Sequence, residues 1–290
     1  MTAGGDPTFG PDWSAGFRRG SEGELRHWVD AALSWCDATD EIALRHFRRD
    51  LEITRKPDTT FVTQADTGVE RLLRDRIAER FPGHGVLGEE YGEDAGGAST
   101  RWIIDPIDGT HNYLRGVPLF ATLIAVEREG ELQASVISAP ALGMRWWAWR
   151  GGGAWVRGGW WGGSAQRTRV SGIATVEEAQ VVYASTRELE SYGRAPGWRG
   201  LLDRAWRERG FGDFWGYTLV AEAAADVMVE SDLSPWDAAA PFVLVEEAGG
   251  RATDLEGARS VYNRTFLATN GRLHDEVLAI LSARTEGAAR

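Results

Sequence analysis

The chain has 290 residues, of which 43% are hydrophobic, with a formal net charge of −11 and one cysteine, Cys36. This length allows one large domain or two closely packed halves, and a lone cysteine excludes an intrachain disulfide. The acidic balance argues against nucleic acid or an anionic membrane as a partner, because both require a basic face.

The first residues of the chain predict a flexible N-terminus over 1–20. They contain no basic segment followed by an apolar one, which would mark a signal peptide, and no later apolar run reaches the length of a membrane span. A single cysteine also fits a reducing compartment. We therefore expect a cytoplasmic protein.

Two helices are predicted next. Apolar residues recur at helical spacing over 24–49, and again from about residue 65 until the chain reaches Pro82-Gly83. The segment between them contains Pro57 and several turn-forming residues, which predict a loop. Lys56, the only lysine of the chain, lies in this loop.

Short apolar and β-branched runs follow over residues 86–156 and predict an antiparallel sheet. Glu129-Gly130 joins two of these runs and predicts a tight hairpin turn. Many of the fourteen tryptophans lie in "RWWAWRGGGAW" and "GGWW", where a stacking site is conceivable. We instead expect them to fill strands and subunit contacts, as aromatic side chains commonly do.

After the glycine-rich stretch 151–163, strand and helix patterns alternate to the end of the chain. This alternation predicts layered sheets with helices packed between and outside them. We divide the folded chain into an N-terminal α+β half, residues 21–165, which carries most of the acidic motifs, and a C-terminal α/β half, residues 166–290. The second half is expected to complete the metal and substrate site.

The segment "WIIDPIDGTHNY" at 102–113 places Asp105 and Asp108 at the end of a buried strand. Pro106 fixes a turn between them, so we expect both carboxylates to point to one side. Gly109 and Thr110 can then open a helix whose free N–H groups face the same point. The segment therefore predicts a phosphate site beside a pair of carboxylates.

Two further acids, Glu89 in "GVLGEE" and Asp237 in "PWDAAAPF", stand in similar settings. Three carboxylates within about 4 Å would repel one another by roughly 12 kcal/mol at an effective dielectric of about 20. They must therefore lie apart, take up protons or bind a metal, and an all-oxygen set suits Mg²⁺. Taken singly, such an acid is more often a helix cap or a solvated charge, and Asp237, at the start of a helix, most of all.

Together, "GEE" at 88–90, "WIIDPIDGTHNY" and "PWDAAAPFVLVEEAGG" resemble the three signatures of the inositol-monophosphatase-like, magnesium-dependent phosphatase family. "KPDTTFVTQAD" resembles the N-terminal lysine loop of that family, which makes Lys56 a candidate site residue. The likeness extends from about residue 25 to 283. It implies a layered α-β-α-β-α sandwich and a homodimer.

The resemblance also implies which groups hold metal. Glu89, Asp105 and the Ile107 carbonyl would bind one Mg²⁺, and Asp105, Asp108 and Asp237 would bind a second. A weaker third ion is implied near Glu89, so that each site would hold two or three ions.

Hydrolysis in such a family implies in-line attack on phosphorus by water that the metal activates. Thr110 would orient this water, with Glu89 and Asp66 nearby as the other catalytic residues. The phosphoryl oxygens would be bound at Asp108 and by the backbone N–H groups of Gly109 and Thr110.

The substrate is expected to be read by Gly212, Asp213 and Glu230. Inositol-preferring members carry small residues where this chain has Asp213 and Phe214, and Glu230 matches another substrate-facing position. Two carboxylates suit an ammonium or imidazolium, which histidinol phosphate carries. The "GDF" element, the tryptophan-rich segment and "ATNGRLHDEVL" also resemble the actinobacterial histidinol-phosphatase type within this family.

We therefore expect a Mg²⁺-dependent phosphomonoesterase that hydrolyses histidinol phosphate in histidine biosynthesis. If Asp213 only caps a helix, the substrate could instead be inositol 1-phosphate or another small sugar or nucleotide phosphate. A third interpretation is a non-catalytic phosphate-binding protein. Such a protein would be expected to lack a metal ligand or Thr110, and all of these residues are present.

Overall fold

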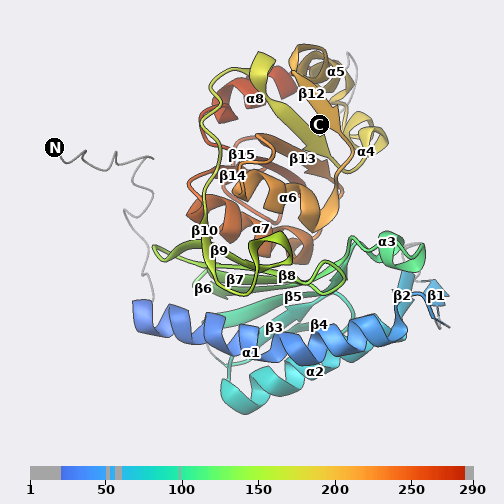
Figure 1. The fold of residues 1–290 in the computed structure, drawn as a ribbon, viewed down its shortest axis with the longest axis vertical. Helices are drawn as coiled ribbons and strands as arrows, with labels where there is room; N and C mark the ends of the chain where they lie inside the picture. The colour runs from blue at the N-terminus through green and yellow to red at the C-terminus, as the bar shows by residue number, and fades with distance from the viewer. Residues whose placement is uncertain (1–20, 50–52, 56–60, 98, 285–290) are drawn as a thin grey trace.

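A computed structural model describes residues 21–49, 53–55, 61–97 and 99–284 (Figure 1). The predicted flexible segment 1–20 and Lys56 lie outside the described residues. Within the described ranges, no helix combines the length and the apolar character that crossing a membrane would require.

The described chain forms five alternating layers of helices and sheets (Figure 1). Three hydrophobic clusters fill the spaces between the layers. The helices that make up the three helical layers are α1 (Glu22–His46) with α2 (Gln64–Arg80), α6 (Asp213–Ala221) with α7 (Pro235–Glu247), and α5 (Ala195–Arg204) with α8 (His274–Leu281) and the short α4 (Thr186–Ser191). The predicted α-β-α-β-α sandwich is confirmed.

The larger sheet has eight strands in the order β10-β9-β8-β7-β6-β5-β3-β4. These are β3 (Gly85–Gly88), β4 (Gly92–Asp94), β5 (Thr100–Asp108), β6 (Ala121–Arg128), β7 (Glu131–Ala139), β8 (Met144–Trp149), β9 (Gly153–Gly158) and β10 (Gln166–Thr168). The prediction of a wholly antiparallel sheet is wrong for one pair, since β3 and β5 are parallel. The reason is that β4 runs antiparallel to β3 at the edge of the sheet. The chain then crosses to the other side of β3, where β5 runs in the same direction as β3.

The predicted hairpin at Glu129-Gly130 is confirmed between β6 and β7. Both residues have positive φ, 52° and 80°, which the tight two-residue turns of β-hairpins require. Trp146 on β8 is fully buried, whereas Trp160 and Trp206 are each 65% exposed. The tryptophans thus serve both the core and the surface.

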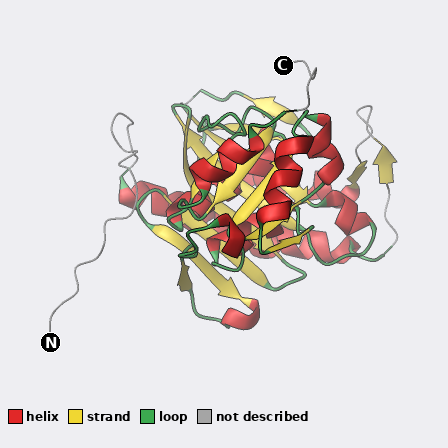
Figure 2. Ribbon diagram, turned by 90° about the horizontal axis from the view of Figure 1, so that it is seen from above, coloured by secondary structure: helices red, strands yellow, loops and turns green. Residues whose placement is uncertain are grey.

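The smaller sheet has the order β12-β11-β13-β15-β14, and helices lie across it when the molecule is seen from above (Figure 2). Its strands are β11 (Gln180–Tyr183), β12 (Arg207–Arg209), β13 (Val227–Ser231), β14 (Arg251–Thr253) and β15 (Thr265–Thr269). A separate ribbon pairs β1 (Ile53–Arg55) with β2 (Phe61–Thr63), and α3 (Thr110–Leu114) follows β5. The eighth strand of the larger sheet, β10, lies just beyond residue 165, and the division at that residue stays a prediction.

Candidate active site

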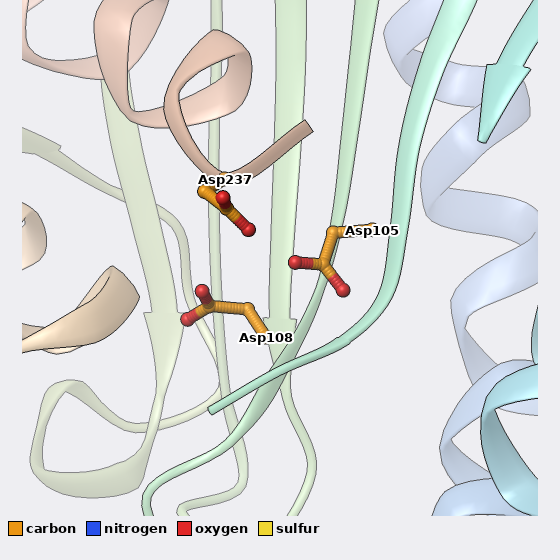
Figure 3. A group of neighbouring side chains, drawn as sticks. All are labelled: Asp105, Asp108 and Asp237. Atoms are coloured by element: carbon orange, nitrogen blue, oxygen red, sulfur yellow. The ribbon is translucent and has the colours of Figure 1, made fainter. Parts of the chain in front are cut away.

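Three carboxylates from distant parts of the chain meet where β5 ends and α7 begins (Figure 3). Asp105, Asp108 and Asp237 each offer an oxygen that lies within 4.8 Å of the others. Asp105 and Asp108 are 2% and 7% exposed, and Asp237 is half-buried. The arrangement is that of a cation site made of oxygen ligands.

Local hydrogen bonds hold the two β5 carboxylates in place. The pairing of β5 with β6 shifts register between Asp105 and Asp108, so the backbone bulges there. The Ile107 N–H donates to Asp105 Oδ1 (3.0 Å), and the Thr110 hydroxyl donates to the Ile107 carbonyl (2.9 Å). The predicted metal-binding carbonyl therefore has one hydrogen bond, and its second lone pair is available to a cation.

Asp237 has a capping role as well as its place in the cluster. It is the third residue of α7, and its Oδ2 accepts from the Ser234 N–H (2.6 Å) in a capping box. This bond fixes the carboxylate beside the helix N-terminus, where the dipole favours negative charge. The capping and metal-binding interpretations of this residue are thus compatible.

Burial is the main electrostatic feature of the cluster. It raises the pKa of Asp105 and Asp108 well above the usual range, and neighbouring carboxylates raise both further. The pKa of Asp237 rises to about 7, again mainly through burial. In the part of the chain that the structure describes, no arginine or histidine forms an ion pair with these three acids.

Asp66 provides a further sign of a cation site. Its Oδ2 accepts from both the N–H and the hydroxyl of Thr63, while its buried Oδ1 has no hydrogen-bond partner. Burial raises the pKa of Asp66 to about 6, and the charge of Glu89 opposes its ionisation. Among the described residues the cluster has carboxylates and no sulfur or imidazole ligand, and this oxygen-only set fits Mg²⁺.

The loop that carries Glu89 is held by Glu70, a residue that sequence reasoning missed. Glu70 is fully buried and accepts from the N–H groups of Glu90 (2.7 Å) and Tyr91 (3.2 Å). A Cβ on Gly88 would lie 2.0 Å from Glu70 Oε1, so a side chain there would displace the Glu70 carboxylate. Nothing in the sequence distinguishes Glu70 from the exposed glutamates of other helices.

Asp213 and its neighbours connect the two halves of the site. Asp213 Oδ2 accepts from Asn112 Nδ2 (2.8 Å), and the Phe214 N–H donates to Asp108 Oδ2 (2.7 Å). The start of α6 has no side-chain cap, so Asp213 does not play the capping role considered above. Burial raises its pKa, which His111 and Asn112 partly oppose.

Two glycines of the predicted site are required by close contacts. A Cβ on Gly212 would lie 2.6 Å from the Ala184 Cα, and one on Gly109 would lie 2.9 Å from the Leu119 carbonyl. Gly109 also has a φ of +77°, which side chains rarely adopt. A side chain at either position would therefore displace the neighbouring backbone.

Glu230 lies on β13 and is 6% exposed, with the Tyr217 hydroxyl donating to its Oε2 (2.6 Å). Burial raises its pKa well above the usual range, and the charges of Asp213 and Glu188 contribute. Glu188, on α4, is a half-buried acid that sequence reasoning missed, as it missed Tyr217. The structure therefore brings Asp213 and Glu230 into one acidic region, with Glu188 beside them.

Comparisons with known proteins agree with this geometry. The family model described as "Inositol monophosphatase family" matches residues 24–286. The chain is 44% identical to a histidinol-phosphatase of Mycobacterium tuberculosis, covering 87% of this chain and 96% of the relative. It is 45% identical to a histidinol-phosphatase of Streptomyces coelicolor, covering 86% and 94%. The structure of extragenic suppressor protein suhB from Bartonella henselae is 27% identical, with a TM-score of 0.79 over 90% of this chain and 100% of the other.

Proposed function

This chain belongs to the inositol monophosphatase family, and from that premise we propose that it is a metal-dependent histidinol-phosphate phosphatase. It would hydrolyse histidinol phosphate to histidinol and phosphate, a step of histidine biosynthesis. The observation that carries the choice of substrate is a second pair of carboxylates, the half-buried Asp213 and the buried Glu230, beside the cluster of Asp105, Asp108 and Asp237.

The metal site follows from the acidic cluster. Glu89, Asp105 and the Ile107 carbonyl would hold one Mg²⁺, and Asp105 with Asp108 and Asp237 a second, with a third near Glu89. When bound, Mg²⁺ supplies positive charge to the carboxylates and the phosphoryl oxygens and lowers the pKa of water. This charge would offset the burial and the mutual repulsion that raise the pKa values of the cluster.

The residues of the chain position the reactants. The Thr110 hydroxyl donates a hydrogen bond to the Ile107 carbonyl, so its oxygen would be free to accept one from the attacking water. Glu89 and Asp66, whose buried Oδ1 has no hydrogen-bond partner, would accept the proton of that water. The first N–H groups of α3 have no partner within the helix, and those of Gly109 and Thr110 would hold the phosphoryl group.

Asp213 and Glu230 would recognise the leaving group by its positive charge. Asp213 is half-buried and Glu230 is buried, and each receives a hydrogen bond from a neutral donor. A cationic group would offset the desolvation that raises the pKa of both carboxyls. The ammonium and imidazolium of histidinol phosphate provide charge-assisted hydrogen bonds, whereas a polyol does not. Gly212, which precedes Asp213, packs directly against Ala184, and a Cβ there would lie 2.6 Å from the Ala184 Cα.

A homodimer is part of the same proposal, and the exposed Trp160 and Trp206 are compatible with a subunit contact. The cytoplasmic location stays a prediction.

The test is phosphate release from histidinol phosphate, inositol 1-phosphate, fructose 1,6-bisphosphate and adenosine 3′,5′-bisphosphate, each with Mg²⁺ and with chelator. We expect a strong preference for histidinol phosphate that chelator abolishes. Asp213→Thr should raise KM for this substrate on the order of tenfold or more while sparing a neutral ester. Asp275→Asn, on the exposed side of α8, serves as the charge-matched control.

If the enzyme prefers a polyol or nucleotide ester, the proposed metal site still holds, and histidinol phosphate is rejected as the substrate. No turnover of any ester would support the interpretation as a binding protein.

A further inference from the structure

Two hydrogen bonds cross the site between the β5–α3 segment and the start of α6. In one, Asn112 of α3 donates to Asp213 of α6 (2.8 Å). In the other, the N–H of Phe214 in α6 donates to Asp108 at the end of β5 (2.7 Å). The metal-binding carboxylate and the proposed substrate-reading carboxylate are therefore tied to each other by backbone and amide groups.

The backbone of Asp213 is held in an unusual conformation. Its φ is +54°, in the left-handed region that favours glycine. Such conformations persist where surrounding contacts fix them and are concentrated at functional sites. Here the Phe214 N–H fixes the backbone on one side of Asp213, and Asn112 fixes its side chain.

The chemistry of the donor is informative. An asparagine amide is neutral, so it can orient a carboxylate without neutralising its charge, as an arginine or lysine would. Glu230 is held in the same way, by the neutral hydroxyl of Tyr217 at 2.6 Å. Neither donor compensates the charge of its carboxylate, and each carboxylate has one oxygen outside these two bonds.

From this geometry we infer that Asn112 is a positioning residue for substrate choice. Its amide holds Asp213 Oδ2 and leaves Oδ1 for the cationic leaving group. Asn112 acts through Asp213 and does not itself bind metal or phosphate. This inference rests on the proposed function, because it requires a cationic substrate at Asp213.

The test is a comparison of kcat and KM for Asn112→Ala and Asn112→Leu, with histidinol phosphate and with β-glycerophosphate, whose leaving group is neutral. Losing a hydrogen bond to a charged group should raise KM for histidinol phosphate on the order of tenfold. We expect kcat for that substrate, and both constants for β-glycerophosphate, to change less than about threefold on this basis. Asn112→Leu keeps most of the volume but not the amide, so it should behave like Asn112→Ala.

Asn263→Ala is the matched control, because Asn263 donates to Asp254 (2.6 Å) in a comparable pair that contacts none of the site residues. It should leave kcat and KM unchanged for both substrates. An equal loss of kcat/KM with both substrates, or a KM for histidinol phosphate that returns to the wild-type value in Asn112→Leu, would overturn the inference. Either result would mean that Asn112 only supports the local fold. A wild-type enzyme with no preference for histidinol phosphate would instead reject the proposed function.

Discussion

The two ends of α7 both carry acids, yet the chain treats them in opposite ways. At the N-terminal end, Asp237 faces Asp105 and Asp108, and the described residues provide no ion pair to these acids. At the C-terminal end, Glu246 pairs with Arg150 (2.6 Å) and with Arg259 (2.9 Å).

The helix dipole explains part of this difference. It favours negative charge at the N-terminus and disfavours it at the C-terminus, so Glu246 and Glu247 require arginines. Asp237 gains from the dipole, but three buried carboxylates still repel one another. The lesson is that the C-terminal acids are compensated by the protein itself, whereas the N-terminal acids are arranged for a cation from solution.

The largest effect is expected from a substitution in the acidic cluster at the N-terminal end of α7. Asp237→Asn should lower kcat/KM at least about a thousandfold, since metal ligation is worth several kcal/mol of transition-state stabilisation. Asparagine can still accept from the Ser234 N–H, so the cap survives. In the presence of chelator, the variant should melt at a higher temperature than wild type, because one buried negative charge is gone.

Phosphate-release kinetics and thermal melting of the same sample check this prediction. Near-normal activity would contradict the assignment of Asp237 as a metal ligand.

Adding Mg²⁺ should produce the next largest effect. Saturation at about a hundred times the dissociation constant stabilises a protein by roughly 2.7 kcal/mol. We expect this gain in wild type and in Glu246→Gln, and its loss in Asp237→Asn. Melting curves recorded over a range of Mg²⁺ concentrations measure it. An equal gain in all three proteins would show that the ion binds elsewhere.

The pH dependence sharpens the same comparison. The pKa of Asp66 is raised to about 6 and that of Asp237 to about 7, above their unfolded values, mainly through burial. Between the unfolded and folded pKa values, the folded state holds protons that the unfolded state has lost, so stability falls as pH rises. In chelator, the melting temperature of wild type should therefore decline from about pH 4 to 7.

The decline should be shallower in excess Mg²⁺, because the cation replaces the protons, and shallower in Asp237→Asn. Identical slopes for Asp237→Asn and wild type in chelator would refute the proposed origin of the decline.

The smallest effect is expected at the C-terminal end of α7. Arg259→Ala removes the pairs with Glu246 and with Glu131 (2.7 Å), which are only partly exposed. The loss should lie on the order of 1 to 2 kcal/mol, between the values for surface and buried pairs. Urea unfolding would measure it. Mg²⁺ affinity and KM should stay unchanged, and a change in either would mean that the two ends are coupled.

Much of the fold could be predicted because its signals are local. Helical periodicity located α1 and α2, and the two residues at 129–130 defined the β6–β7 hairpin. The parallel pairing of β3 with β5 could not be predicted, because it depends on which side of β3 the chain returns to. Strand patterns specify that a segment is extended and do not specify its neighbour.

The candidate site divides along the same line. The sequence by itself determined the acidic motifs around Asp105, Asp108 and Asp237, because each combines a run of apolar residues with a turn or cap that acts within a few positions. Only the tertiary structure decided that Asn112 meets Asp213, 101 residues away, and that Glu70 holds the loop after β3. Such contacts depend on the packing of separate layers, and no local pattern encodes the distance between two side chains.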